Sequence, residues 1–277
     1  MDRYAVMGNP IGHSFSPRIH SAFADETDQQ LSYNAMLVGI GEFPQESSRF
    51  FSEGGKGLNV TVPFKQEAWA LAEELSSDAE IAGAVNTLFK DQDGRLQGHN
   101  TDGLGLVRDI KNNHSSSIEG KNVLVLGAGG ATRGILLPLL REQPLSICIA
   151  NRTRSKAEEL AVLFSAYGNV SACGLEDLKE KKGGQKKIDW IINASSASLQ
   201  GELTPISAET LSQDAICYDL MYAQEETVFC QWARQAGAIK VMDGIGMLVE
   251  QAAESFYLWR GIRPNTASVI QSLKKVI

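Results

Sequence analysis

The feature that most constrains how this chain can fold is an apolar run that passes directly into glycines, VLVLGAGGA at residues 123–131. Such a run predicts a buried parallel strand, a tight turn and then a helix whose free N–H groups can bind a pyrophosphate. Gly127 and Gly129 occupy the first two glycine positions of the G-x-G-x-x-G spacing, whereas Thr132 stands at the third. Because a short glycine pattern is weak by itself, it predicts a nucleotide-binding fold only in combination with the segment after the next strand.

The next apolar run, ICIA, ends in Asn151-Arg152-Thr153-Arg154-Ser155-Lys156, where a site for NAD would be expected to carry Asp or Glu. An acidic residue there accepts a hydrogen bond from the ribose 2′-hydroxyl, whereas arginine matches the oxygens of a 2′-phosphate. Thr153 can add its hydroxyl to such a site while it caps the following helix. The segment therefore predicts NADP as the cofactor. The alternative is an ordinary solvated helix start, but helix starts favour acidic residues.

The composition limits the class of protein. With 277 residues, of which 43% are hydrophobic and 21% charged, the chain can bury a large core and is long enough for two domains. A net charge of −7 without a long basic run argues against nucleic acid or an anionic membrane as a partner. The lysine-rich stretch at residues 179–187 is interpreted as a solvated loop.

The cysteines and the N-terminus indicate a cytoplasmic protein. The four cysteines form no C-x-x-C pair, and Cys148, Cys173 and Cys217 lie in apolar runs where cysteine acts as a small hydrophobe. The N-terminal segment lacks the pattern of a secretory signal, and no apolar run approaches the length of a membrane span.

Strand-like and helix-like segments alternate along the chain, which is typical of a parallel α/β architecture. In the first hundred residues we expect strands at 4–7, 32–38, 57–61, 85–89 and 96–99, and a helix from Ser16, as its N-cap, through Phe23. Strands expected at 123–126, 146–150, 170–172, 190–194, 216–220 and 240–242 give the six of a full dinucleotide-binding sheet. The last helices are expected at 247–260 and 265–276. The first of these has an apolar stripe through Leu248, Ala252 and Phe256 that can dock on the first domain.

Several polar residues are not required by a nucleotide-binding fold. Ser14 and Ser16 precede a helix, an arrangement that suits a small carboxylate but that can also serve only as a cap. Asn59 and Thr61 lie at the end of an expected strand, where side chains of an open α/β sheet meet ligands.

Lys65 follows this strand and is a candidate acid or base. Apolar neighbours would desolvate its amine and favour the uncharged form, although most lysines lie on the surface; these neighbours are Val62, Phe64, Ala68 and Trp69. Amide and carboxylate groups at Asn86 and at Asn100, Thr101 and Asp102 follow two more strands. Either set by itself can also be a turn.

Taken together, the motifs closely resemble those of the shikimate dehydrogenase family. Matching segments cover essentially the whole chain, in the family's order and spacing: GNPIGHSFSPRIH, GLNVTVPFK, AGAVNTL, GHNTDG, GAGGA, NRT, INASS, YDLMY and DGIGMLVEQAA. The resemblance implies the NADPH-dependent reduction of 3-dehydroshikimate to shikimate, a step in the biosynthesis of chorismate and the aromatic amino acids.

The resemblance also implies roles for individual residues. Ser14 and Ser16 would bind the substrate carboxylate, and Lys65 and Asp102 would form the catalytic pair. The ring hydroxyls would be bound by Asn59, Thr61, Asn86 and Asp102, with Tyr222 and Gln251 at the border of the substrate. The cofactor would be lined by Gly127, Ala128, Gly129, Gly130, Ala131, Asn151, Arg152, Thr153, Arg154, Ser155, Lys156, Leu220 and Gly244. One position departs from the family, because Ser77 stands where members often carry an acidic residue that touches the cofactor.

The residue types account for the chemistry without a metal. A lysine beside a carboxylate can donate or remove the proton that hydride transfer to a carbonyl requires. The four histidines show no ligand spacing with cysteine or an acid, and His13 is expected to orient the serine loop rather than act as the base.

Two alternative functions remain. A quinate/shikimate dehydrogenase that uses NAD is disfavoured by the basic segment at 151–156. A non-catalytic NADP-binding regulator is disfavoured by Lys65 and Asp102, although a fold does not fix a function.

We therefore expect a two-domain α/β protein. Residues 1–101 together with 247–277 are predicted to form the substrate-binding and catalytic domain, with the C-terminal helices packing back on it. Residues 102–246 are predicted to form a Rossmann-type NADP-binding domain. The expected partner is a small-molecule substrate, and the chain is expected to be a monomer or a homodimer.

Overall fold

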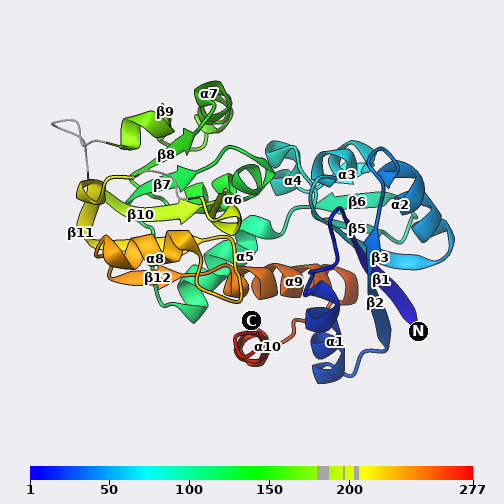
Figure 1. Ribbon diagram of the computed structural model, residues 1–277. Helices are drawn as coiled ribbons and strands as arrows, with labels where there is room; N and C mark the ends of the chain where they lie inside the picture. Colours follow the sequence, from blue (N-terminus) through cyan, green and yellow to red (C-terminus); the bar gives the residue numbers. More distant parts are fainter. Residues whose placement is uncertain (180–186, 196, 203–205, 277) are drawn as a thin grey trace. The chain divides into compact units, whose positions relative to one another are not determined.

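The chain forms two compact units, each built around its own β-sheet (Figure 1). The computed structural model describes residues 1–179, 187–195, 197–202 and 206–276. Unit 1 comprises Met1–Arg108 and Leu248–Ser272, and unit 2 comprises Asp109–Met247 with the C-terminal residues from Leu273. The first boundary follows Arg108 rather than residue 101, because the helix that begins at Asp102 belongs to unit 1.

Unit 1 contains a six-stranded sheet in the order β2-β1-β3-β5-β6-β4. Its strands are β1 (Asp2–Gly8), β2 (Leu31–Leu37), β3 (Gly55–Val60), β4 (Glu74–Leu75), β5 (Thr87–Lys90) and β6 (Leu96–His99). Its helices are α1 (Ser16–Glu26), α2 (Phe43–Ser52), α3 (Lys65–Leu71), α4 (Ser77–Ala82) and α5 (Asp102–Arg108), with most of α9 (Ile245–Arg260) and α10 (Thr266–Leu273).

The sheet of unit 1 is mixed, so the prediction of parallel strands throughout is wrong here. β1 is parallel to β2 and β3, whereas β5 is antiparallel to both β3 and β6. Only residues 91–95 separate β5 from β6. Because a parallel crossover needs a dozen or more residues, this short connection forces a hairpin. The two-residue strand β4 has too few residues to show a pattern in the sequence.

The two faces of this sheet differ in character. One face belongs to a core of aliphatic and phenylalanine side chains, which includes Ala5, Met7, Leu58, Val60, Phe43, Phe50 and Phe64. The alternate strand positions, Tyr4, Tyr33 and Asn59, lie on the opposite face, where rings from α1 and α9 contact the two tyrosines. The predicted return of the C-terminal helix to the first domain is confirmed, because Ser255 and Arg260 of α9 bond to Asn59 and Asp2.

Unit 2 contains a six-stranded parallel sheet in the order β12-β11-β10-β7-β8-β9. Its strands are β7 (Asn122–Leu126), β8 (Ser146–Asn151), β9 (Val170–Gly174), β10 (Ile188–Asn193), β11 (Leu211–Asp219) and β12 (Lys240–Met242). Its helices are α6 (Gly130–Arg141), α7 (Arg154–Phe164) and α8 (Val228–Gln235), with a π-helical turn at Asp109–Asn113 and 3₁₀ turns at Leu175–Leu178, Ala197–Gln200 and Ala208–Thr210. This strand order is that of a Rossmann-type sheet, so the predicted dinucleotide-binding fold is confirmed.

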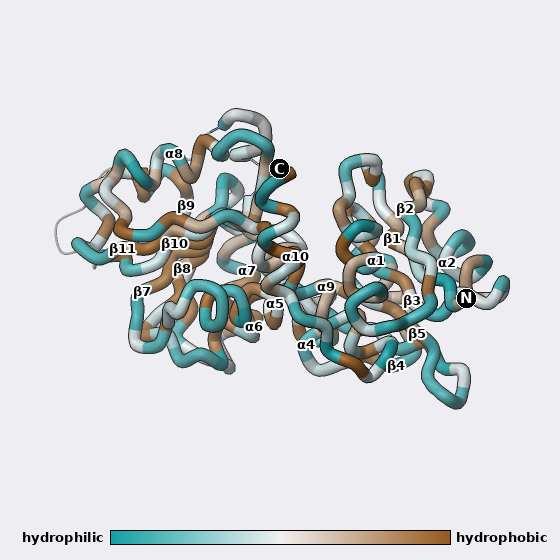
Figure 2. The backbone as a smooth tube through the Cα atoms, turned by 90° about the horizontal axis from the view of Figure 1, so that it is seen from below, coloured by the Kyte–Doolittle hydropathy of each residue, from teal (hydrophilic) through white to brown (hydrophobic). Residues whose placement is uncertain are grey.

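Both faces of the second sheet are covered. Leu124, Leu126, Ile191 and Cys217 pack with Phe229 and Ala233 of α8, and the alternate residues Val123, Val125, Ile147 and Ile149 are also buried. Figure 2 shows the central strands of this sheet mainly in brown, the colour of hydrophobic residues. Strands buried on both faces are continuously apolar, which is why the sequence displayed them so clearly.

Strand and helix ends differ from the predicted ones. β11 begins at Leu211 rather than at Ile216, since Gln213 and Asp214 are exposed and leave no apolar run to mark its first half. The last helix is shorter than predicted and spans Thr266–Leu273. In the lysine-rich stretch, residues 180–186 lie outside the described residues, as does Ser196 of the INASS motif. None of the helices in the described part of the chain is long and apolar enough to cross a membrane.

Candidate active site

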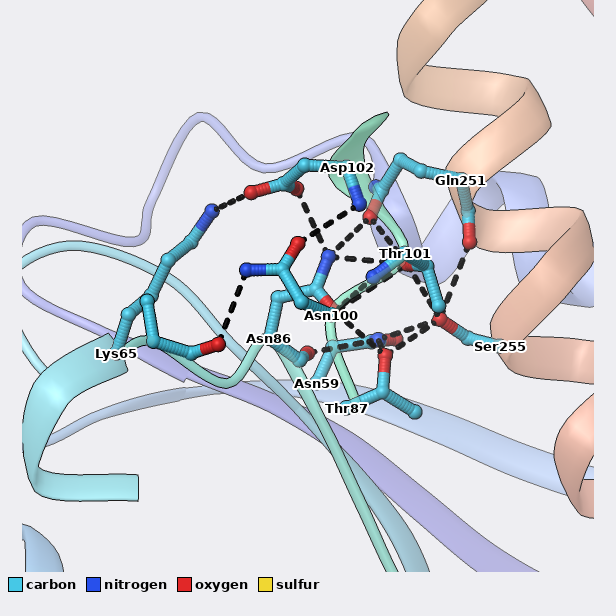
Figure 3. Close-up of polar contacts among 10 residues, drawn as sticks. Asn59, Lys65, Asn86, Thr87, Asn100, Thr101, Asp102, Gln251 and Ser255 are labelled. Atoms are coloured by element: carbon cyan, nitrogen blue, oxygen red, sulfur yellow. Dashed lines mark hydrogen bonds and ion pairs between the residues drawn. The ribbon is translucent and has the colours of Figure 1, made fainter. Parts of the chain in front are cut away.

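The helices α3 and α5 each begin with a charged residue, and these two side chains form an ion pair (Figure 3). Lys65 Nζ lies 2.5 Å from Asp102 Oδ2, and the side chains are only 17% and 9% exposed. Water is largely excluded from this pair, so its electrostatic interaction is stronger than it would be on an open surface.

The surroundings of Lys65 differ in part from the predicted ones. Phe64 and Ala68 are fully buried, and Phe64 stacks on Phe43 at 5.3 Å, which anchors the start of α3. Val62 and Trp69 are exposed, so the prediction that they desolvate the amine is wrong. Val62 follows β3 and Trp69 lies on α3, and both side chains face solvent. The carboxylate of Asp102 contacts the amine instead.

Asp102 is fixed by two asparagines as well as by Lys65. Its Oδ1 accepts a hydrogen bond from Asn86 Nδ2 at 2.8 Å, and its backbone N–H donates to Asn100 Oδ1 at 3.1 Å. Asn100 in turn donates to the carbonyl of Ala84 at 3.0 Å. Both carboxylate oxygens therefore have a donor before any substrate is present.

Asn86 is the centre of the polar cluster. Its Nδ2 faces Asp102 Oδ1, Thr101 Oγ1 and Gln251 Oε1 at 2.8, 3.0 and 3.1 Å. Its Oδ1 accepts from the backbone N–H of Thr101 and from the hydroxyl of Thr87, both at 2.9 Å. With 2% of its surface exposed, Asn86 connects β5, α5 and α9 in one network.

Two members of this network were not identified from the sequence. Ser255 accepts from Asn59 Nδ2 at 3.0 Å and shares a 2.8 Å hydrogen bond with Thr87. Ser255 lies four residues after Gln251 on α9, and residues at that spacing share a helix face, so the position of Gln251 could have indicated it. No sequence pattern indicated Thr87, because its hydroxyl meets Asn59 of β3 and Ser255 of α9 only in the folded chain.

The serine motif lies at the start of α1, but the cap differs from the prediction. Ser16 is the first helical residue and Phe15 is the N-cap, without a side-chain cap bond. The N–H of Ser16 donates instead to Ser14 Oγ at 3.3 Å, because Ser14 is the hydroxyl that precedes the helix. The side chain of His13 is exposed and forms no hydrogen bond with any described residue, so the structure gives no support for its predicted orienting role.

Thr61 packs against Gly8, the last residue of β1, which leads into the segment with the serine motif. A Cβ placed on Gly8 would lie 2.4 Å from Thr61 Cγ2, so the two segments are in direct contact. The backbone N–H of Asn9 donates to the carbonyl of Val62 at 3.0 Å. The predicted substrate residues of unit 1 thus lie on segments that the fold connects, whereas the predicted cofactor residues are in unit 2.

The glycine turn after β7 fits a pyrophosphate. Gly127 has φ +102°, and a Cβ there would meet the backbone of Ala194 at 3.3 Å, so glycine is required. A Cβ on Gly129 or Gly130 would meet nothing within 4 Å, and α6 begins at Gly130 with its first N–H groups available. Thr132 at the third position is fully buried and donates to the carbonyl of Gly127 at 2.9 Å, which explains why a hydroxyl is accepted there.

The basic segment after β8 contains two different arginines. Arg154 pairs with Glu176 at 3.3 Å and with Asp177, which raises the pKa of Arg154. Arg152 is exposed and has no ion-pair partner among the residues that the structure describes. Among the described residues of this segment, Arg152 and Lys156 are both exposed and without an ion-pair partner, so both are available to a phosphate, whereas Arg154 is already paired.

Thr153 occupies the N-cap of α7 but lacks the predicted side-chain cap bond. Its ψ is 98°, whereas Ser76 and Thr227, which both form a side-chain cap bond, have ψ 153°. The backbone of Thr153 is therefore turned away from the geometry of a bonded cap. The carbonyl of Thr153 accepts a hydrogen bond from Asn151 Nδ2 at 2.9 Å, which fixes the segment between them.

The loops after β11 and β12 approach each other closely. A Cβ on Gly244 would lie 2.1 Å from the carbonyl oxygen of Leu220, so any other residue would displace this backbone. Asp219 fixes the same loop, since it accepts hydrogen bonds from Met221 N at 3.0 Å and Thr227 Oγ1 at 2.7 Å. Burial raises the pKa of Asp219, against the effect of these hydrogen bonds. Burial also raises the pKa of Tyr222.

A Rossmann-type sheet with an open glycine turn, and a separate α/β unit with a buried lysine and carboxylate, are typical of a two-domain nicotinamide-dependent oxidoreductase. In the described part of the chain, no group of three or more histidine, cysteine, aspartate or glutamate side chains is arranged to hold a metal ion.

Sequence comparison identifies the family. Three family models match: "Shikimate dehydrogenase substrate binding domain" at residues 6–88, "Shikimate / quinate 5-dehydrogenase" at 109–204 and "Shikimate 5'-dehydrogenase C-terminal domain" at 244–274. A shikimate dehydrogenase (NADP(+)) of Marinobacter nauticus is 51% identical over 276 residues, covering 99% of this chain and 98% of the relative. The chain belongs to the shikimate dehydrogenase family.

Solved structures agree with this assignment. An Ael1 enzyme from Pseudomonas putida is 44% identical with a TM-score of 0.90, covering 99% of this chain and 98% of that one. The shikimate 5-dehydrogenase of Thermus thermophilus, in complex with NADP(H) and shikimate, is 31% identical with a TM-score of 0.86, covering 100% of both chains.

Proposed function

We propose that the chain catalyses the reversible NADPH-dependent reduction of 3-dehydroshikimate to shikimate, with Lys65 and Asp102 as the catalytic pair. The observation that carries this proposal is the 2.5 Å ion pair between them, almost closed to water, in a member of the shikimate dehydrogenase family. The reaction belongs to the biosynthesis of chorismate and the aromatic amino acids.

The chemistry divides between the cofactor and the protein. The nicotinamide, when bound, supplies the hydride for the C3 carbonyl. Lys65 donates a proton to the carbonyl oxygen as negative charge develops there, and it removes that proton in the reverse direction. Asp102 holds the lysine amine and Asn86 holds Asp102, so the donor is oriented before the substrate arrives.

The substrate residues divide by the part of the molecule that they would bind. Ser14 and Ser16 would bind the carboxylate, while Asn59, Thr61, Asn86 and Asp102 would bind ring hydroxyls. Gln251 Oε1 already accepts from Asn86 and Thr101, so the amide NH₂ of Gln251 is the group available to a substrate oxygen. Tyr222 would border the substrate.

The cofactor residues, all in unit 2, are likewise divided by the part of NADP that they would bind. The pyrophosphate would lie on the turn from Gly127 to Ala131, and the 2′-phosphate on the segment from Asn151 to Lys156, with Leu220 and Gly244 as further contacts. The 2′-phosphate contact is assigned mainly to Arg152, because Arg154 is already paired with Glu176 and Asp177. This arrangement supports NADP over NAD.

The remaining assignments concern organisation. We assign substrate binding to unit 1, which contains both Lys65 and Asp102, and NADP binding to unit 2. A cytoplasmic location, the absence of a nucleic-acid partner and a monomeric or homodimeric state are part of the same proposal. Light scattering of the purified chain tests the oligomeric state, and cell fractionation tests the location, both independently of catalysis.

The decisive experiment follows absorbance at the nicotinamide band while the chain is mixed with shikimate and either NADP or NAD. We expect reduction of NADP, little reduction of NAD, and loss of the signal in Lys65→Ala. The exposed lysine of β3 provides a matched control, Lys56→Ala, which should keep full activity. Turnover of quinate with NAD would favour the broader dehydrogenase, and NADP binding without turnover would favour the regulator.

A further inference from the structure

A tyrosine that no substrate motif includes is bonded to one of the proposed substrate residues. Tyr33 of β2 donates its hydroxyl to Asn59 Oδ1 at 2.7 Å, and both residues are buried. β2 and β3 lie on either side of β1, so the phenol extends across that strand to reach Asn59. This contact was not visible in the sequence, because 26 residues separate the two partners.

The hydrogen bonds of Asn59 fix which way its amide points. Nδ2 lies 3.2 Å from the backbone carbonyl of Asn86, which can only accept, so the NH₂ group must be on that side. The same NH₂ group also faces Thr87 Oγ1 at 3.2 Å and Ser255 Oγ at 3.0 Å. Its two hydrogens are therefore fully used by the protein.

The carbonyl side of the amide is different. Among the described residues only Tyr33 donates to Oδ1, which leaves its second lone pair for a ligand. Asn59 can consequently offer a ligand an acceptor but no donor. Such a group recognises a hydroxyl of the substrate that donates its hydrogen.

Tyr33 is well suited to hold this geometry. Its ring stacks on His20 of α1 with centroids 4.2 Å apart and an angle of 6° between the planes. Burial raises the pKa of Tyr33 well above its ordinary value, and an interaction with the Ser16 side chain opposes this shift. The phenol therefore keeps its proton and remains a donor to Asn59.

We propose that Tyr33 is a positioning residue for the substrate: its hydroxyl fixes Asn59 as an acceptor for one ring hydroxyl. This inference rests on the proposed function, which assigns Asn59 to the substrate. Tyr33 itself takes no part in the proton transfer.

The adjacent strand supplies a matched control. Tyr4 is the register partner of Tyr33, is also buried and stacks on Trp259 at 4.8 Å, but its hydroxyl accepts from Arg260 at 3.3 Å. Tyr33→Phe and Tyr4→Phe each remove one buried hydroxyl from the same face of the sheet. Only the first removes a contact to a proposed substrate residue.

We expect Tyr33→Phe to raise the KM for shikimate about three- to tenfold, the value of one net hydrogen bond. The kcat and the KM for NADP should change by no more than about twofold. Tyr4→Phe should leave the KM for shikimate, the kcat and the KM for NADP unchanged, and it should lower the melting temperature by about as much as Tyr33→Phe does. Because Tyr33 acts through Asn59, Tyr33→Phe should add little to Asn59→Ala. Equal shikimate KM changes in both tyrosine variants, or additive effects with Asn59→Ala, would overturn the inference.

A second measurement changes the ligand instead of the protein, first with the unmodified chain and then with Tyr33→Phe. Shikimate analogues with fluorine in place of each ring hydroxyl in turn keep the size but lose the donor. The hydroxyl bound by Asn59 should be one whose replacement weakens binding, and Tyr33→Phe should have no further effect on that analogue. If all three analogues bind as shikimate does, the inference fails while NADP-linked oxidation of shikimate still supports the proposed function. If shikimate itself is not oxidised, the proposed function fails first.

Discussion

The polar residues of unit 1 and those of the segment proposed to bind the 2′-phosphate in unit 2 are organised in opposite ways. Lys65, Asp102 and Asn86 are largely shielded from water and hydrogen bonded to one another, whereas Arg152 is exposed and unpaired among the described residues. Charge that appears only during a reaction is best stabilised by groups already fixed in place. A phosphate arrives fully charged and can be bound by a solvated side chain. We therefore expect substitutions to be strongly coupled in the first region and local in the second.

The largest effect tests the shielded region directly. Lys65→Ala should leave the chain folded and able to bind shikimate but lower kcat by about 10² to 10⁴, the usual range for a general acid or base. Because the amine acts mainly in the transition state, kcat and kcat/KM should fall together. Steady-state kinetics beside equilibrium shikimate binding measure both properties. Near-normal turnover would assign proton transfer to another group.

The next prediction measures the coupling itself. Both oxygens of Asp102 accept hydrogen bonds, one from Lys65 Nζ and one from Asn86 Nδ2. In Asp102→Asn the new NH₂ group faces one of these donors, which cannot accept its hydrogens. We expect weaker shikimate binding as well as a lower rate. In a double-mutant cycle, Asp102→Asn together with Lys65→Ala should cost far less than the sum of the single effects. Additive losses would show that the two side chains act independently and would remove the contrast between the regions.

The exposed region is tested by Arg152→Ala. Loss of a charge-assisted contact to the 2′-phosphate should raise the KM for NADP about ten- to hundredfold, equivalent to about 1.5–3 kcal/mol, and leave weak use of NAD unchanged. Arg154→Ala is the control, since this exposed arginine already pairs with Glu176 and Asp177; its effect should be at most about fivefold. Equal weakening of NADP and NAD by Arg152→Ala would show that Arg152 supports the fold or the adenine instead.

The last prediction concerns stability rather than activity, through a buried base of unit 1. Burial lowers the pKa of His20 from 6.5 to about 3. Between these values the unfolded chain binds a proton that the folded chain does not, so stability falls as pH drops below 6.5, by at most about 1.4 kcal/mol per pH unit. Urea unfolding from pH 7 to pH 4 should show a shallower decline for His20→Phe. An unchanged slope would mean that other groups cause the acid sensitivity.

Sequence patterns predicted the two sheets unequally. The central strands of unit 2 were visible because they are apolar on both faces, and a continuous hydrophobic run marks such a strand. In unit 1 the antiparallel strand β5 was misjudged, since a run of four residues carries no information on direction. The C-terminal helix was placed correctly, because it follows the last strand of the second sheet and combines an apolar stripe with the polar residue Gln251.

The candidate site shows the same limits. Lys65 and Asp102 were identified from their motifs, and the structure brings them together. Tyr33 and Thr87 were missed because a tyrosine or threonine in a strand is usually part of the packing, and only the folded sheet shows what its hydroxyl contacts. The two arginines of the basic segment are indistinguishable by residue type. They differ because Glu176 and Asp177, which follow β9, form ion pairs with Arg154 and not with Arg152.

The hydrogen bond between Asn59 and Ser255 has a consequence for how the chain is made. The partners are 196 residues apart, with nearly all of unit 2 encoded between them. A ribosome that adds about 5–20 residues per second needs on the order of 10–40 s to pass from one to the other. During that interval the face of the first sheet with Tyr4 and Tyr33 is without α9, one of the two helices that contact it, while all six strands of unit 2 are synthesised before α9 is complete. The unit whose synthesis begins first is therefore completed only after the strands of the second sheet, and a chain that ends before α9 lacks part of the polar network around Lys65.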